Sequence, residues 1–253
     1  PRRRPRHQRP PAGWSGRAAG FARRPATAKR RSSLGETNMH FSACFNFPII
    51  GIPCTIDNDI FGTQYTLGYD TALNTVVEAI DKIRDTASSH NRLFFVEVMG
   101  RDSGFIALNA GIGAGAEEIL IPEENIGLDK MLESLVKSKE AGKTSSIVVV
   151  AEGEKTGKNT FELAEYVEEN LPEYDVRVSV LGHMQRGGAP SCFDRVLASR
   201  YGVSAVELLL SGASNLMVGF VNNQIQYTAL DKAVKEHHNI DQELMRVSDI
   251  ISI

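Results

Sequence analysis

The chain has 253 residues, of which 42% are hydrophobic and 23% charged, and its formal net charge is -3. These values are ordinary for a globular protein of one large or two modest domains, and no apolar run approaches the roughly 18–20 residues that cross a bilayer. The three cysteines, Cys44, Cys54 and Cys192, form no C-x-x-C pair, so they favour a reducing, cytoplasmic location over a disulfide framework or a zinc site.

Residues 1–46 form a basic segment of low complexity that is rich in Arg, Pro, Ala and Gly. The first 47 residues hold 11 Lys and Arg against one acid, Glu36, whereas the rest of the chain holds 17 bases and 30 acids. Such a segment cannot bury enough apolar surface to offset its ordering entropy, so we expect disorder. Four interpretations stay open: a transit peptide, a basic arm for nucleic acid, a membrane-surface patch, and an artefact of translation.

From Phe47 onward, short apolar runs alternate with segments of helical periodicity. In chain order, we expect strand Phe47–Ile52, helix Asp70–Ser89, strand Leu93–Met99, helix Ser103–Gly113, strand Glu118–Pro122, helix Leu128–Ala141, strand Ile147–Ala151, helix Thr160–Asn170, strand Val176–Leu181, helix Ser191–Leu210, strand Leu216–Asn222 and a short helical tail. Alternating strands and helices indicate parallel βαβ units and therefore an α/β fold, a layered α/β/α sandwich with a mostly parallel sheet.

Polar clusters follow four of these strands directly, and their sequences are "PCTIDND", "GRDSG", "EGEKTGKN" and "GHMQRGG". In such sheets ligands bind beyond the carboxyl ends of the strands, so we expect the four clusters to meet at one crevice. Asp57 and Asp59 of the first cluster repel each other and do nothing for a core. They belong either to a solvated loop or to a chemical site.

Two motifs resemble phosphate loops without fitting them. "GEKTGKN" (Gly153–Asn159) lacks one spacer and the Ser or Thr that holds Mg²⁺, and "GIGAGA" (Gly111–Ala116) lacks the required spacing and is better explained by close packing. His237 and His238 lie in the charged helical tail, where we expect solvent exposure and not metal binding.

"GHMQRGG" (Gly182–Gly188) combines a His and an Arg with glycines that admit close backbone approach. Arg offers a bidentate fork to a phosphate and His adds a donor, so the motif suits an anion cradle. Taken by itself it also fits a glycine turn with a solvated Arg. Its position after a strand, beside the Asp57 cluster, favours the cradle.

The order and spacing of five segments carry a family resemblance: "GIPCTIDND", "SSHNR", "VEVMGRDSG", "AEGE" and "VLGHMQRGGAPSCFDRVLASRYG". From about Phe47 to the C-terminus the chain resembles the bacterial type of 6-phosphofructokinase. The resemblance implies that family's fold and phosphoryl transfer from ATP, with Mg²⁺, to the 1-hydroxyl of fructose 6-phosphate, giving fructose 1,6-bisphosphate in glycolysis.

The same resemblance assigns roles to matching positions. Asp57 would be the base that takes the proton of the sugar hydroxyl, with Thr55 beside it, Arg101 stabilising charge near the reacting phosphate, and Asp59 near the Mg²⁺. The implied substrate-binding residues are Thr55, Ile56, Asp57, Arg92, Met99, Gly100, Arg101, Glu152, Arg177, His183, Met184, Gln185 and Arg186.

Oligomerisation and regulation are also implied by the resemblance alone. Arg92 and Arg177 match two arginines that reach the 6-phosphate of a neighbouring subunit, so a shared site and a homotetramer are expected. Positions for a nucleotide or phosphoenolpyruvate effector are matched by Arg84, Gly115, Ala116, Glu117, Lys143, Thr144 and Ser145. A further lysine position of the family holds Ala141.

The family's N-terminal segment, which holds ATP and Mg²⁺, has no counterpart in residues 1–46, so we expect residues 47–253 to form a partial phosphofructokinase domain. Strand Phe47–Ile52 would then lack its neighbouring parallel strands. Three hypotheses follow: a kinase that needs the absent part from elsewhere, a non-catalytic fragment that binds sugar phosphate or effector, and a nucleic-acid binder acting through residues 1–46. Nucleic-acid and membrane partners are the least favoured.

The phosphoryl donor depends on position 54. ATP-dependent members usually have Gly there and pyrophosphate-dependent members have Lys, whereas this chain has Cys54. Because a thiol lacks the charge that would attract pyrophosphate, and "GHMQRGG" is the ATP-type form, we expect ATP. Pyrophosphate remains the alternative.

Overall fold

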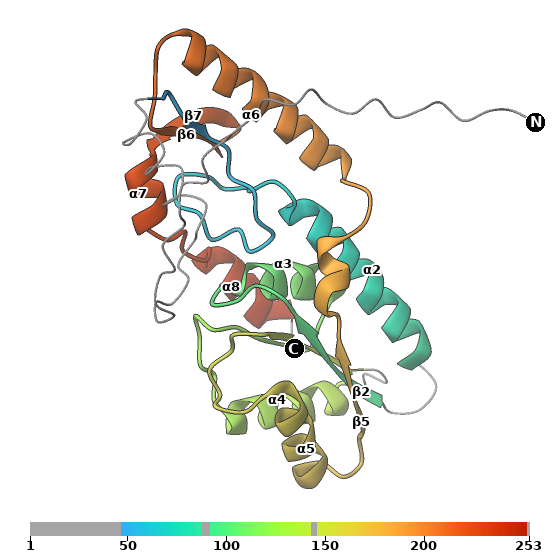
Figure 1. Cartoon of the computed structure of the whole chain (residues 1–253). Helices are drawn as coiled ribbons and strands as arrows, with labels where there is room; N and C mark the ends of the chain where they lie inside the picture. The colour runs from blue at the N-terminus through green and yellow to red at the C-terminus, as the bar shows by residue number, and fades with distance from the viewer. Residues whose placement is uncertain (1–46, 88–91, 143–145, 252–253) are drawn as a thin grey trace, which may run out of the picture. The chain divides into compact units, whose positions relative to one another are not determined.

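The computed structural model describes residues 47–87, 92–142 and 146–251, all within one unit of the chain, residues 32–253. The basic segment 1–46 lies outside the described residues. The described part contains two β-sheets, each with helices on both faces (Figure 1). None of its helices combines the length and the apolar character needed to span a membrane.

The larger sheet has four parallel strands in the order β3-β4-β2-β5. These strands are β2 (Arg92–Val98), β3 (Glu118–Leu120), β4 (Ser146–Ala151) and β5 (Asp175–Val180). One face is covered by α2 (Tyr69–Ala87), α3 (Phe105–Ala114) and α8 (Gln242–Ile251), and the other by α4 (Leu128–Glu140) and α5 (Thr160–Asn170) (Figure 1). The expected three-layer α/β arrangement is confirmed.

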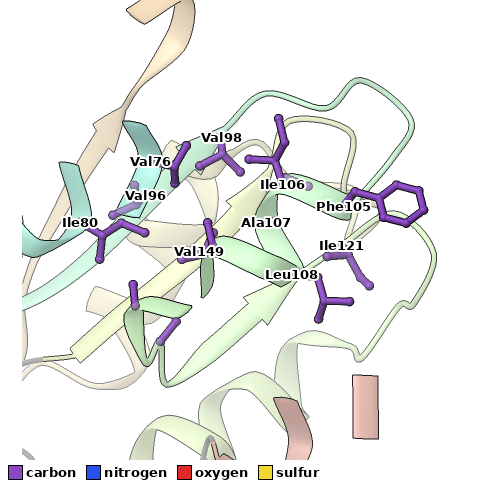
Figure 2. Packing of buried hydrophobic residues seen from close by; sticks show 14 of the residues in the cluster. Val76, Ile80, Val96, Val98, Phe105, Ile106, Ala107, Leu108, Ile121 and Val149 are labelled. Atoms are coloured by element: carbon purple, nitrogen blue, oxygen red, sulfur yellow. The ribbon is translucent and has the colours of Figure 1, made fainter. Parts of the chain in front are cut away.

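Alternating side chains of β2 divide the core into two clusters. Leu93 and Phe95 pack with α4 and α5, whereas Val96 and Val98 pack with α2 and α3. Figure 2 shows the second cluster, in which Val76 of α2 lies near Val96 and Val98. Every residue of β4 is buried, as expected of a central parallel strand covered on both faces.

The first predicted strand lies in the smaller sheet. The other three strands that are followed by polar clusters lie in the larger sheet. The strands of the smaller sheet, in the order β1-β6-β7, are β1 (Ile50–Gly51), β6 (Leu216–Val221) and β7 (Gln224–Ala229). Helix α6 (Cys192–Leu210) covers one face and α7 (Leu230–Lys235) the other. Hence the polar clusters follow strands of two sheets, and not of one.

Two elements of the small sheet differ from the sequence prediction. The strand predicted over Phe47–Ile52 is limited to Ile50–Gly51, which pairs only with β6 among the described strands. Strand β7 was not predicted. It pairs antiparallel with β6 through a two-residue turn in which Asn222 and Asn223 have φ values of 50° and 62°, the left-handed pair of a type I′ hairpin.

Helices α2 and α6 are tied together at their N-termini. The buried carboxylate of Asp194 in α6 accepts hydrogen bonds from the backbone N–H groups of Gly68 and Thr71, each 2.9 Å long. It therefore caps α2 where orphan N–H groups and the helix dipole favour an anion. Ser191, the N-cap of α6, also donates to Asp70 in the first turn of α2. These bonds fix a large-sheet helix against a small-sheet helix.

Tyr201 of α6 supports a testable prediction, since its fully buried hydroxyl donates to the carbonyl of Tyr65 at 2.7 Å and lies 2.8 Å from Thr63 Oγ1. Burial raises its pKa to about 12. Because the folded pKa exceeds the unfolded value, this contribution to stability is present below about pH 10 and is lost between about pH 10 and pH 12. Tyr201→Phe should lower the free energy of unfolding by about 1–3 kcal/mol at neutral pH and flatten its alkaline decline.

Urea unfolding at about pH 7 and about pH 11 measures both effects. Tyr227→Phe is the matched control, since Tyr227 is 50% exposed. An alkaline decline as steep in Tyr201→Phe as in the wild type would contradict the prediction.

Candidate functional site

Two loops from different sheets meet at the candidate site. One follows β1 and carries Asp57, and the other follows β2 and carries Arg101. The buried Ser103 joins them, since its hydroxyl donates to the carbonyl of Asp57 at 3.1 Å and its N–H donates to the carbonyl of Gly100 at 3.0 Å. The predicted convergence of these two clusters is therefore present, although it bridges two sheets.

The carboxylate of Asp57 is the central group of the site. The residue is 3% exposed, and its Oδ2 lies 3.5 Å from Nε of Arg101. Its Oδ1 is buried and has no hydrogen-bond partner among the described residues. Burial and the neighbouring charges of Asp59 and Glu152 raise the pKa of Asp57, while Arg101 and Arg186 oppose the rise. An oxygen that is buried, unpartnered and more basic than usual can accept a proton.

Glu152, directly after β4, holds the Arg101 loop in place. One of its carboxylate oxygens accepts hydrogen bonds from the N–H groups of Gly100 and Arg101, at 3.3 and 2.7 Å. Arg101 has a left-handed φ of 55°, which a non-glycine residue keeps only when its surroundings hold it. Next to Glu152, a Cβ added to Gly153 would lie 1.8 Å from the carbonyl oxygen of Arg101, so the two loops touch backbone to backbone.

The motif "GHMQRGG" forms a short 3₁₀ helix, η1 (Gly182–Arg186), directly after β5. Gln185 is 1% exposed, accepts from the N–H of Met99 at 3.1 Å and donates to the carbonyl of Gly182 at 3.1 Å. Its amide therefore anchors η1 to the end of β2. His183, Met184 and Arg186 are exposed, so the His and Arg that were predicted to hold phosphate are accessible.

Asn58 and Asp59 continue the loop beyond the buried carboxylate. Asn58 is buried with a left-handed φ of 54°. Its side chain donates to the carbonyl of Gln64 at 3.0 Å and accepts from the N–H of Thr66 at 2.9 Å. Thr55, the predicted neighbour of the base, accepts from the N–H of Asp57 through its hydroxyl at 3.2 Å.

The sequence prediction for His238 was wrong. Helix α7 ends at Lys235, and His238 is half-buried, with its ring stacked on Phe105 at 4.8 Å between centroids. His237 is exposed, as predicted. No local signal distinguishes two adjacent histidines in a charged segment, because the partner of His238 lies more than 130 residues away in the sequence.

Arg92 and Arg177 lie apart from this group. Arg92 begins β2, and at about 3.3 Å per residue this position is roughly 20 Å from the strand's other end. Both arginines pair with Asp175, at 3.2 and 2.7 Å. Both arginines lie in the N-terminal halves of their strands, away from the ends at which the Arg101 loop and η1 begin.

The residues predicted for an effector site are partly brought together. Arg84 donates to the carbonyl of Gly115 at 2.9 Å, and its buried Nε has no partner among the described residues. Ala116 is buried, and the buried carboxylate of Glu117 accepts from the N–H of Ile147. Lys143, Thr144 and Ser145 lie outside the described residues.

The site offers carboxylate oxygens to a metal ion, but its described residues do not form a complete set of protein ligands. The described residues contain no group of three or more His, Cys, Asp or Glu side chains placed to hold a metal ion. Mg²⁺ is commonly bound through one or two carboxylates together with substrate phosphates. Asp59, the residue predicted to lie near the Mg²⁺, is half-buried two residues after Asp57 and could supply one such carboxylate.

Comparison with known proteins identifies the family. The family model described as phosphofructokinase matches residues 29–209, so the chain belongs to the phosphofructokinase family. The match begins within the basic segment 1–46, so the boundary at residue 47 stays a prediction. Among solved structures, the phosphofructokinase of Saccharomyces cerevisiae resembles the chain with a TM-score of 0.71 and 31% identity, over 87% of this chain and 31% of that one.

Curated relatives are more similar to the chain in sequence. The chain is 54% identical over 209 residues to the ATP-dependent 6-phosphofructokinase of Listeria welshimeri, covering 82% of this chain and 64% of the relative. It is 52% identical over 206 residues to ATP-dependent 6-phosphofructokinase 1 of Thermus thermophilus, covering 81% and 63%. The chain therefore spans a little under two thirds of the length of these relatives.

The contact between Gly153 and Arg101 gives a prediction about the site. Gly153→Ala should force the Arg101 loop away and lower the free energy of unfolding by about 1–3 kcal/mol, because the added Cβ would overlap the backbone carbonyl of Arg101. Gly202→Ala is the control, since nothing lies within 4 Å of a Cβ there and the residue is within α6. It should stabilise the protein by roughly 0.5–1 kcal/mol. Equal effects of the two changes in thermal unfolding would contradict the prediction.

Proposed function

We propose that this chain carries the sugar-phosphate half of an ATP-dependent 6-phosphofructokinase, with the base that activates the 1-hydroxyl of fructose 6-phosphate. Phosphoryl transfer to that hydroxyl would be completed with an ATP-binding part. The observation that carries the proposal is the buried carboxylate of Asp57, whose Oδ2 faces Arg101 and whose Oδ1 has no hydrogen-bond partner among the described residues. The names of the Listeria and Thermus relatives support ATP as the donor.

Asp57 is suited to accept the proton of the attacking hydroxyl. Its raised pKa makes the carboxylate a better base, and Oδ1 is free to accept a hydrogen bond. General base catalysis of this kind contributes about 10²–10⁴-fold. Arg101 is 66% exposed on its side chain, so its guanidinium can reach a transferring phosphoryl group while it pairs with Asp57.

The other end of the sugar would be held by η1. The exposed His183 and Arg186 offer donors to a phosphate, and the buried Gln185 keeps the helix in position. Glu152 is exposed as well as hydrogen-bonded to the Arg101 loop, so its second oxygen can accept from a sugar hydroxyl. Mg²⁺, bound near Asp59 with ATP, would neutralise charge on the phosphate oxygens.

Three finer features belong to the same proposal. Arg92 and Arg177, in the N-terminal halves of their strands, suit a phosphate held in a neighbouring subunit, which implies a homo-oligomer such as a tetramer. Arg84 and Gly115 would bind the phosphate of an effector such as phosphoenolpyruvate. Cys54, exposed at position 54, carries no charge that would favour pyrophosphate.

Binding of fructose 6-phosphate tests the phosphate cradle. Calorimetry should detect binding to the wild-type chain, and Arg186→Gln should weaken it by about tenfold or more, since a hydrogen bond to a charged group contributes about 1.5–3 kcal/mol. Arg246→Gln is the control, because Arg246 is an exposed arginine of α8 that pairs with Glu243. The cradle assignment fails if the wild type does not bind or if the two variants bind alike.

Asp57→Asn tests the base. The substitution removes a buried charge, so it should raise the free energy of unfolding by about 0.5–2 kcal/mol. Residues kept for function often lower the stability of a fold, and replacing them often raises it. Binding of fructose 6-phosphate should persist, and any turnover with ATP and Mg²⁺ should fall by about 10²–10⁴-fold. A variant that is less stable, or that turns over as the wild type does, would remove Asp57 from this role.

The alternative is a non-catalytic fragment that binds sugar phosphate or effector. The specific observation in its favour is the coverage of only 64% of the Listeria relative. Binding of fructose 6-phosphate without turnover by the purified chain would support it, and phosphorylation with ATP would exclude it.

A further inference from the structure

The segment between α7 and α8 passes alongside the loop that carries Asp57. It begins at the C-cap of α7, Glu236, and leads to α8, whose Leu244 and Met245 pack with the α2–α3 core cluster. Ile240 is 6% exposed and belongs to the same cluster. The segment is thus anchored in the core on one side and tied to the small sheet through α7 on the other.

Within this segment, His238 contacts the Asp57 loop twice. Its Nδ1 lies 3.1 Å from the carbonyl oxygen of Asn58, and its backbone N–H donates to the carbonyl of Asp59 at 3.2 Å. A carbonyl oxygen can only accept, so Nδ1 carries the proton in this contact. An isolated antiparallel bridge between Ile60 and His237 continues the pairing.

These bonds act on a backbone that needs support. Asn58 has a left-handed φ and follows Asp57 directly, so the peptide after the carboxylate keeps its direction only while its neighbours hold it. The Asn58 side chain is held by Gln64 and Thr66. Its carbonyl is held by His238. Loss of the His238 hydrogen bond to this carbonyl would allow the peptide that follows Asp57 to move.

The same imidazole also contacts the second loop. Its ring stacks on Phe105, with centroids 4.8 Å apart and an interplanar angle of 25°. Phe105 is 5% exposed and begins α3 directly after the Arg101 loop. One side chain therefore touches the backbone beside Asp57 and the aromatic ring that ends the loop of Arg101.

We propose that His238 is a positioning residue of the sugar-phosphate site, which sets the separation of Asp57 and Arg101 by bonding to the loop of one and stacking on the helix after the other. Its consequence for ligand binding rests on the proposed function, but the contacts themselves do not. His238 touches no reacting group and acts through Asn58 and Phe105.

Two substitutions separate the two contacts. His238→Asn places an amide N–H near the position of Nδ1 and loses the stacked ring, whereas His238→Phe keeps an aromatic ring over Phe105 and loses the donor. His237→Asn is the matched control, because His237 is exposed and takes part only through its backbone. Hydrogen exchange of the full chain, followed by mass spectrometry, and calorimetry with fructose 6-phosphate are the two measurements.

In His238→Phe we expect exchange to accelerate in residues 55–60, while residues 99–105 and helices α4 and α5 stay unchanged because the stacked ring is kept. Binding of fructose 6-phosphate should weaken about fivefold, the effect of one net hydrogen bond. His238→Asn should restore protection of residues 55–60 and leave 99–105 less protected. His237→Asn should match the wild type.

Exchange that rises equally across α4 and α5 in His238→Phe would show a purely structural residue and would overturn the inference. Three other results would also overturn it. Residues 55–60 could stay as protected in His238→Phe as in the wild type, or lose protection while fructose 6-phosphate binds with unchanged affinity. His238→Asn could also protect residues 55–60 no better than His238→Phe does. If the wild type does not bind fructose 6-phosphate but the exchange pattern holds, the proposed function fails and the positioning of the two loops by His238 stands.

Discussion

The contact between the buried carboxylate of Asp57 and the guanidinium of Arg101 is the constraint on which the site depends. Burial alone disfavours an ionised carboxylate, and the nearby acids Asp59 and Glu152 add to this, so the arrangement is unfavourable unless surrounding bonds hold it. Ser103 supplies one such bond. The fold thus holds Asp57 in surroundings that raise the pKa of its carboxyl group.

Holding that pair requires two sheets to keep a fixed relation. The Asp57 loop follows a strand of the small sheet and the Arg101 loop a strand of the large one. Asp194 of α6 caps α2 across this division, and the segment carrying His238 crosses it again near the C-terminus. The relation of the two loops therefore involves contacts between residues more than 100 positions apart in the sequence.

The predicted site residues form two groups in the described part of the chain. In the first group, Gln185 anchors η1 and Glu152 anchors the Arg101 loop. The second group, Arg92 and Arg177, lies in the N-terminal halves of β2 and β5, paired with Asp175.

The sequence alone determined the alternation of elements and the candidate chemistry, because hydrophobic periodicity and capping are local: helix α5 was predicted at its observed bounds, Thr160–Asn170. The tertiary structure decided three things: the division into two sheets, the hairpin strand β7, and the position of His238 against Asn58 and Phe105. Periodicity reports which face of an element is buried. It does not report which distant loop a side chain will meet.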